Sequence, residues 1–140
     1  MLRFKDIADS ADGYHRVRQV ARNEVQLLWH SDYWDGPRSG MLLYQQEQCW
    51  FQLLAENEES QEWYRRFAIL RLSFDQLVEE NRWHELFRRC VGTHTDYNHD
   101  EERIIGAVRP QECHAEFYDA YGKRLPRDYS LCEVLGWFES

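Results

Sequence analysis

The sequence predicts an α+β domain in which an antiparallel sheet of about five strands carries two helices. Short segments with the apolar pattern of strands dominate the first half of the chain, and one more lies at the C-terminus. Helical spacing appears in only two longer segments of the second half. Because the early strands are not separated by helices, this order favours an antiparallel sheet over alternating β-α-β units. The 140 residues fit one domain, residues 1–140, which is large enough to bury a core.

Several short segments have the residue pattern of strands. They are residues 14–21, 25–30, 41–44, 49–55, 64–72 and 131–138, of which the first is the least regular. Val25, Leu27 and Trp29 recur with a period of two, so we expect them on one face. The next two segments are joined by four polar residues, which predicts an antiparallel hairpin. Both are almost continuously apolar, so both of their faces should be covered. Residues 104–108 are expected to form a short strand or a buried loop.

The first predicted helix begins after Ser73, which has Gln76 three residues later, as a capping box requires. It should end near Val91, with Gly92 just beyond it. Its apolar residues change sides after the second turn. Phe74, Leu77 and Val78 lie on one side, and Trp83, Leu86, Phe87 and Cys90 lie on the other. Either the helix breaks at residues 79–82, or its halves pack against different layers. We favour a continuous helix whose second half is sandwiched.

The second predicted helix begins at Pro110, which suits the first position of a helix. Gly122 suits the position that follows its last turn. One face of this helix is apolar, because apolar residues lie four, seven and eight positions after the first of them. Its members are Cys113, Phe117, Ala120 and Tyr121.

Charge and composition exclude several classes of protein. The net charge is −8, and the chain has no basic patch, so binding to nucleic acid is disfavoured. The N-terminus lacks the apolar core of an export signal, and no apolar stretch is long enough to span a membrane. We therefore expect a cytoplasmic protein that has no membrane segment. The four scattered cysteines, without a C-x-x-C pair, are expected to be buried free thiols.

The most distinctive segment is residues 29–40, which concentrates aromatic and acidic side chains between two predicted strands. His30, Asp32 and Asp35 are the candidate catalytic residues, because two carboxylates and an imidazole serve acid–base chemistry. The candidate binding residues are Trp29, Tyr33, Trp34 and Arg38. The structural alternative, which we consider the better one, is that both aspartates accept backbone hydrogen bonds that shape the loop.

A resemblance accompanies this loop. The string D-Y-W-D-G-P-x-S-G at residues 32–40 resembles a group of uncharacterised bacterial proteins. The similarity continues through residues 83–87 and 91–94 to residues 136–138. The group carries no catalytic assignment, so the resemblance implies no activity for this chain.

A polar loop at residues 94–100 is the other candidate. It begins like a calcium loop, but Glu101 and Ala107 occupy the positions that need glycine and a bidentate glutamate. His94, Asp96 and His99 could instead hold a transition metal, although polar loops often collect such residues. We interpret Glu80 and His84, four residues apart on the first helix, as a solvated pair.

Three functions follow from these patterns. The first choice is a small acidic protein-interaction module of the inhibitor or immunity type, whose charge would attract a partner with a basic surface. The second is a small-molecule-binding domain or a hydrolase-like enzyme that uses the Asp32/Asp35 loop. The third is a metal-binding domain built on residues 94–100. No cofactor motif is present, and the absence of catalytic motifs leans against an enzyme.

Overall fold

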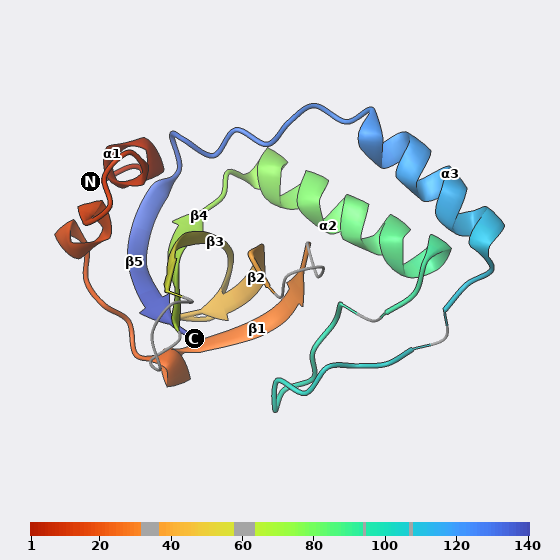
Figure 1. Cartoon of the computed structure of the whole chain (residues 1–140), viewed down its shortest axis with the longest axis horizontal. Coiled ribbons are helices and arrows are strands. Elements are labelled where there is room, and N and C mark those ends of the chain that lie inside the picture. The colour runs from red at the N-terminus through yellow and green to blue at the C-terminus, as the bar shows by residue number, and fades with distance from the viewer. Residues whose placement is uncertain (32–36, 58–63, 94, 107) are drawn as a thin grey trace.

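The computed structural model describes residues 1–31, 37–57, 64–93, 95–106 and 108–140, except for the side chains of residues 111 and 112. Its elements confirm the predicted α+β class, with an antiparallel five-stranded sheet and two long helices (Figure 1). In chain order they are α1 (Phe4–Ala8), β1 (Val25–His30), β2 (Ser39–Tyr44), β3 (Glu47–Asn57), β4 (Tyr64–Arg71), α2 (Phe74–Cys90), α3 (Gln111–Gly122) and β5 (Glu133–Glu139). None of the helices in these ranges has the length and apolar content to cross a lipid bilayer.

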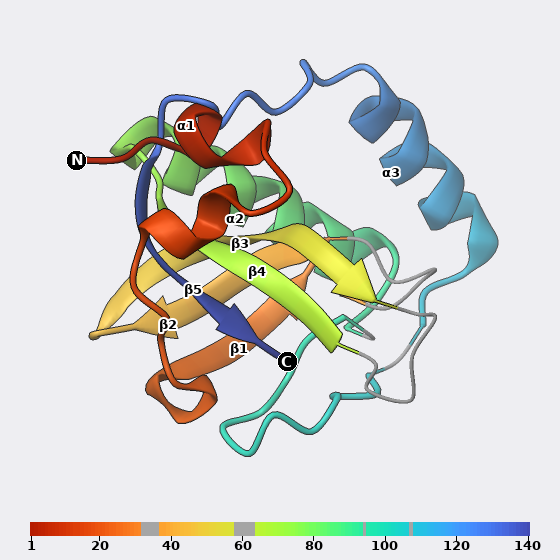
Figure 2. The same cartoon turned by 60° about the vertical axis from the view of Figure 1, so that its left-hand side comes forward.

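The five strands lie side by side in chain order, each antiparallel to the next (Figure 2). The predicted hairpin of β2 and β3 is confirmed, and its turn contains only two residues. Gln45 and Gln46 both have positive φ, 51° and 67°. Positive φ at both central residues gives the turn the twist that antiparallel strands need.

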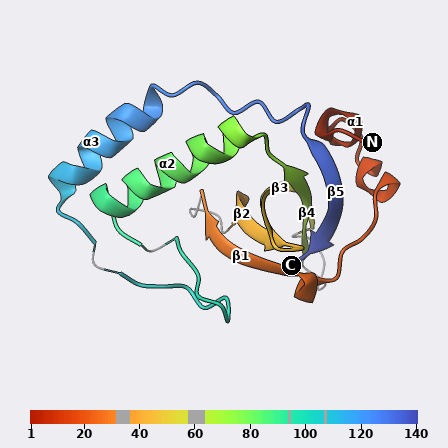
Figure 3. The ribbon, with the colours of Figure 1, turned by 180° about the vertical axis from the view of Figure 1, so that it is seen from behind.

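The sheet curls, so that the end of β5 comes close to the start of β1 (Figures 1 and 3). The chain before β1 also pairs with β5, through a bridge from Gln19 to Trp137. The two faces of the sheet carry separate cores. Trp50 and Leu70 belong to the core beneath α1 and α2, whereas Phe51 belongs to the other. Both faces are therefore buried, as the continuous apolar runs predicted.

One prediction about β1 is wrong. Val25 and Leu27 face the second core, but Trp29 faces the first core with Trp50. The cause is a register shift between Leu27 and Trp29, a β-bulge that sends the end of the strand to the opposite face. The bulge turns Trp29 toward α2.

Helix α2 is continuous, as we favoured. The Ser73 hydroxyl accepts from the Gln76 amide at 3.2 Å, which confirms the capping box. Gly92, with φ of 143°, donates to the Phe87 carbonyl oxygen at 3.1 Å after the last turn. The second half of α2 lies between the sheet and α3 (Figures 1 and 3). Phe87 packs edge-on against Phe117 of α3, with 5.6 Å between ring centroids.

Four other expectations need correction. Residues 14–21 form no strand, because Gly13–Arg16 is a 3₁₀ turn and the chain beyond it is extended. Helix α1 lies where no pattern predicted an element. Ile105 is 85% exposed and residues 104–106 belong to no strand, so this segment is neither strand nor buried loop. Pro110 caps α3 rather than beginning it, and Gly122 is its last residue.

Candidate functional site

A cavity of about 410 Å³ opens where the ends of β1 and β2 meet α2 and α3. Both strand ends that line it flank residues 32–36. Eight of its thirteen lining residues come from the ends of β1 and β2, with Ser31 just beyond β1, and from α2. The full lining is Trp29, His30, Ser31, Ser39, Glu80, Trp83, His84, Phe87, Thr95, Phe117, Tyr118, Tyr121 and Arg127. Six of these residues are Trp, Phe or Tyr, so the walls suit a ligand with a flat apolar surface.

Trp29 and His84 form a parallel stack in the cavity wall. Their ring centroids are 4.2 Å apart, and the planes differ by 4°. His84 Nε2 lies 2.8 Å from Asp96 Oδ1, and Arg88 Nε lies 3.2 Å from Asp96 Oδ2. Asp96 is 8% exposed, so both contacts lie in a largely dry setting, although its Oδ1 accepts no hydrogen bond from the described residues. The arrangement fixes the imidazole plane against the indole.

The polar loop after α2 reaches this wall because it docks on the free edge of β1. His30 N donates to the Thr95 carbonyl oxygen at 3.2 Å, and Tyr97 N donates to the Leu28 carbonyl oxygen at 3.0 Å. A bridge joins Trp29 and Asp96. The loop thus brings Thr95 and Asp96, 66 positions or more along the chain from Trp29, to its side. On the other edge of β1, a side chain at Gly40 would meet the Trp29 carbonyl oxygen at 2.2 Å, so only glycine allows this approach.

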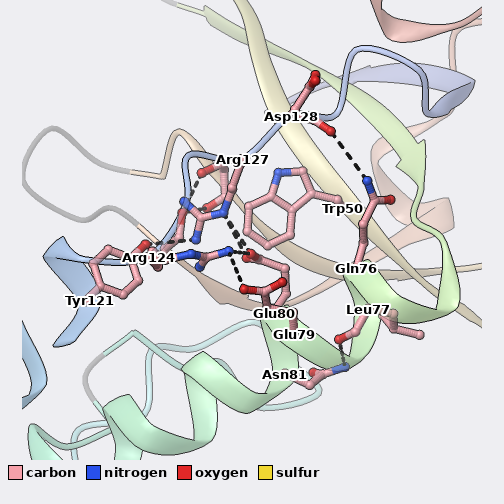
Figure 4. Close-up of polar contacts among 12 residues, drawn as sticks. Trp50, Gln76, Leu77, Glu79, Glu80, Asn81, Tyr121, Arg124, Arg127 and Asp128 are labelled. Atoms are coloured by element: carbon pink, nitrogen blue, oxygen red, sulfur yellow. Dashed lines mark hydrogen bonds and ion pairs between the residues drawn. The ribbon is translucent and has the colours of Figure 1, made fainter.

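Glu80 and Arg127, which also line the cavity, belong to a buried ion cluster centred on Glu80 of α2 (Figure 4). Glu80 is 1% exposed. Arg124 Nη2 donates to Oε1 at 2.6 Å, and Arg127 Nε donates to both carboxylate oxygens at 3.0 Å. Arg127 also lies over the Trp50 ring, 5.0 Å from its centroid, and donates to the Tyr121 hydroxyl at 2.9 Å. The cluster therefore ties α2, α3 and the sheet together.

Burial and the carboxylate of Glu80 together shift the pKa values of two neighbouring groups. Burial lowers the pKa of Arg127, but attraction to Glu80 and Tyr121 outweighs it, so the guanidinium pKa is raised overall. Burial, followed by repulsion from Glu80, raises the pKa of the Tyr129 phenol far above its usual value, and this hydroxyl donates to Glu80. At neutral pH both groups stay protonated.

Two polar atoms in the cavity wall have no hydrogen-bond partner among the residues that the structure describes. They are Trp83 Nε1 and Thr95 Oγ1, both of them buried. The hydroxyls of Ser31 and Ser39, in contrast, satisfy each other at 2.5 Å. A buried polar atom without a partner costs free energy, and both atoms are enclosed by protein and do not face the cavity.

The structure brings only some of the predicted site residues to the cavity. Trp29 and His30 line it. Arg38 does not line it, and its carbonyl oxygen accepts from Leu53 N at 2.8 Å in the sheet. The other members of that loop, Asp32, Tyr33, Trp34 and Asp35, lie outside the described residues.

The metal candidates are separated in the part of the chain that is described. Asp96 faces His84 and Arg88, whereas the His99 imidazole is 83% exposed and lies 3.3 Å from Asp100. His94 lies outside the described residues. No group of three histidines, cysteines or acids suited to a metal occurs in the ranges given above.

Sequence reasoning missed the two α2 residues that matter most here. Glu80 and His84 were interpreted as a solvated pair, but Glu80 is buried, only 11% of the His84 side chain is exposed, and each contacts a partner from elsewhere in the chain. A signal was available, because Leu77, Glu80 and His84 share one helical face at spacings of three and seven. Leu77 packs into the first core, so a carboxylate on that face needs a cation.

Comparisons with known proteins give no relative: no family model, curated protein or solved structure matches the chain. The resemblance of residues 32–40 to uncharacterised bacterial proteins therefore stays a prediction.

Proposed function

We propose that this protein binds a small molecule in the cavity between the sheet, α2 and α3. The cavity itself carries the proposal, since its volume of about 410 Å³ falls in the range of roughly 300–1,000 Å³ common for ligand sites. Apolar aromatic walls combined with a few fixed polar groups are typical of such sites. Of the second function suggested by the sequence, a small-molecule-binding domain or a hydrolase-like enzyme, the proposal keeps the small-molecule-binding domain.

The rigidity of the walls supports binding. Trp29 is fixed by the His84 stack, and Arg127 is fixed by Glu80 and Tyr121. Groups held in place before a ligand arrives lose little conformational entropy when it binds. Catalysis does not enter the proposal, because it would depend on Asp32 and Asp35, whose positions are not described.

The other expectations for this protein stay predictions beside this one. A partner with a basic surface agrees with the net charge of −8, and a cytoplasmic location stays an expectation from the sequence. A cavity between strand ends and helices has no role in an inhibitor that works through a flat surface, and for this reason we place small-molecule binding first.

A thermal-shift screen tests the proposal. A panel of aromatic compounds, each with an acidic, neutral or basic substituent, is added at millimolar concentration and the unfolding midpoint is measured. A ligand present at about 100 times its Kd stabilises the native state by roughly 2.7 kcal/mol, which is several degrees for a domain of this size. At least one compound should produce such a shift.

Two serine variants locate the binding. Ser31→Leu places a branched apolar side chain at the cavity wall and should abolish the shift, whereas Ser10→Leu, at an exposed position in the N-terminal turn, should retain it. Circular dichroism checks that both variants are folded. A panel that shifts no midpoint, or equal shifts in both variants, would contradict the proposal.

A further inference from the structure

Two half-buried cysteines lie at the same end of the α2–α3 pair. Cys90 is the last residue of α2, and Cys113 belongs to the first turn of α3. The other two cysteines, Cys49 and Cys132, are buried, so the expectation that all four thiols are buried is wrong for this pair. We propose that Cys90 and Cys113 form a reversible disulfide that clamps α2 to α3 under oxidising conditions. This proposal does not depend on ligand binding.

The contacts between α2 and α3 place the two cysteines at the same level of the helix pair. The helices are antiparallel, so a step forward along α2 matches an equal step back along α3 (Figures 1 and 3). The matched pairs in contact are Glu80 with Arg124, Trp83 with Tyr121, and Phe87 with Phe117. One turn further, residues 90 and 91 therefore come opposite residues 113 and 114.

Burial shows which of these residues share a flank of the interface. Neighbours on a helix diverge by about 100°, so each helix end has one residue turned toward the sheet and one turned away from it. Val91 is 2% exposed and His114 Nε2 is buried, so these two residues are turned inward. Cys90 and Cys113 are the outward residues, each turned about 50° from the line of contact toward the same side. Both thiols are therefore on the flank that reagents can reach.

A backbone hydrogen bond holds this end of the helix pair together. Arg109 N, one residue before the cap of α3, donates to the Val91 carbonyl oxygen at 2.9 Å. Cys90 packs against the apolar cluster that contains Phe117 of α3. Cys113 lies one helical turn before Phe117 in the sequence. The two cysteines thus lie on segments that are fixed against each other.

The geometry of packed helices puts the pair within reach of a disulfide. Helices in direct contact have axes about 8–10 Å apart, and their Cα atoms lie about 2.3 Å from each axis. Residues turned about 50° to the same side then have Cα atoms roughly 5–7 Å apart. Disulfides span about 4.4–6.8 Å between Cα atoms, so the pair meets the main distance requirement.

The reaction is thiol–disulfide exchange with a small-molecule disulfide such as oxidised glutathione. One cysteine thiolate attacks the oxidant and releases a first thiol, and the second cysteine attacks the mixed disulfide and releases another. The S–S bond of the oxidant breaks, and one forms between Cys90 and Cys113. Two protons and two electrons pass from the pair to the oxidant, which leaves as two thiols. An excess of thiol reverses the reaction, as a redox-sensing pair requires.

The bond fixes the helical wall of the cavity. Helices α2 and α3 together supply seven of the thirteen lining residues. The two cysteines are 23 positions apart in the chain, so the cross-link also restricts the unfolded state. For a loop of this length and a domain of this size, the melting midpoint should rise by roughly 5–10 °C.

Oxidation of the full chain followed by peptide mapping tests the proposal. The reduced protein is freed of reductant and incubated under native conditions with oxidised glutathione. Free thiols are blocked with N-ethylmaleimide, and tryptic peptides are analysed without reduction. Trypsin cuts after Arg103, so the disulfide would join two separate peptides. We expect the Cys90–Cys113 link in a species with the mass of a monomer, with a rise in the melting midpoint that dithiothreitol removes.

Two variants show whether position rather than reactivity decides the outcome. Cys113→Ser should remove both the link and the thermal shift. The double variant Cys113→Ser, Asp119→Cys is the matched control, because the side chain of Asp119 is 73% exposed and lies on the side of α3 away from α2. Its new thiol should react with glutathione without a link to Cys90.

Four results would overturn the proposal. They are two thiols that stay free in an excess of oxidant, glutathione on both cysteines without a link, disulfides that form only between chains, and a control variant that links to Cys90 as readily as the native pair does. None of these results bears on ligand binding, which the thermal-shift screen tests separately.

Discussion

Replacing Glu80 by glutamine should lower the free energy of unfolding by roughly 3–5 kcal/mol, the usual effect of removing one partner of a buried ion pair. Glu80 is 1% exposed and accepts from Arg124 at 2.6 Å and from Arg127 at 3.0 Å on both oxygens. In the variant an amide N–H₂ faces a guanidinium N–H, so two donors oppose each other. A change of this size would lower the melting midpoint by roughly 10–20 °C.

The matched control is Glu79→Gln, one position earlier on the same helix. Its carboxylate is half exposed and 4.0 Å from Arg124, so its loss should cost less than about 1 kcal/mol. Urea unfolding followed by far-ultraviolet circular dichroism gives both values. Equal destabilisation by the two substitutions would refute our claim that the buried ion cluster holds α2, α3 and the sheet together.

Three further results are expected. The free energy of unfolding should fall as the pH rises above about 9. Burial raises the pKa of Cys49 to about 11 and also raises that of Tyr129, so unfolding at high pH releases their protons. Urea unfolding that gives the same free energy at every pH between 8 and 11 would contradict this. Iodoacetamide at pH 8 should label the half-buried Cys90 before Cys49, as peptide mass spectrometry would show, and equal labelling would argue against the buried thiol. Replacing Gln45 and Gln46 with Asn-Gly should raise stability by roughly 1 kcal/mol or more, because both residues have positive φ, and a lower melting midpoint would count against the turn geometry.

Local patterns were enough to predict most of the fold. The strands from residue 25 to residue 71 and the long helix α2 follow from apolar periodicity and from the Ser73 cap, both of which act over a few residues. The failure that matters for the site depended on tertiary structure. The bulge that turns Trp29 depends on pairing with β2, and a strand's period cannot reveal a register shift.

The candidate site was predictable only in part. Trp29 and His30 were found because they lie next to a distinctive loop. Glu80, by contrast, gains its role from Arg124 and Arg127, which lie 44 and 47 positions later in the chain. Sequence spacing on one helix cannot show which distant cation will meet a carboxylate. The pairing of His84 with Asp96 depends in the same way on a loop that docks on the edge of β1.

The most direct test of ligand binding is a titration of the tryptophan side chains by ¹H–¹⁵N NMR. The six indole N–H groups give one signal each, and those of Trp29 and Trp83 belong to the cavity wall. Trp137 packs against Tyr14 on another part of the sheet and serves as the internal reference. On addition of the compound that gives the largest thermal shift, the Trp29 and Trp83 signals should move, because both rings line the cavity, and the Trp137 signal should stay in place. Movement of Trp137 alone, or no movement of Trp83 at saturation, would contradict the assignment of this cavity as the binding site.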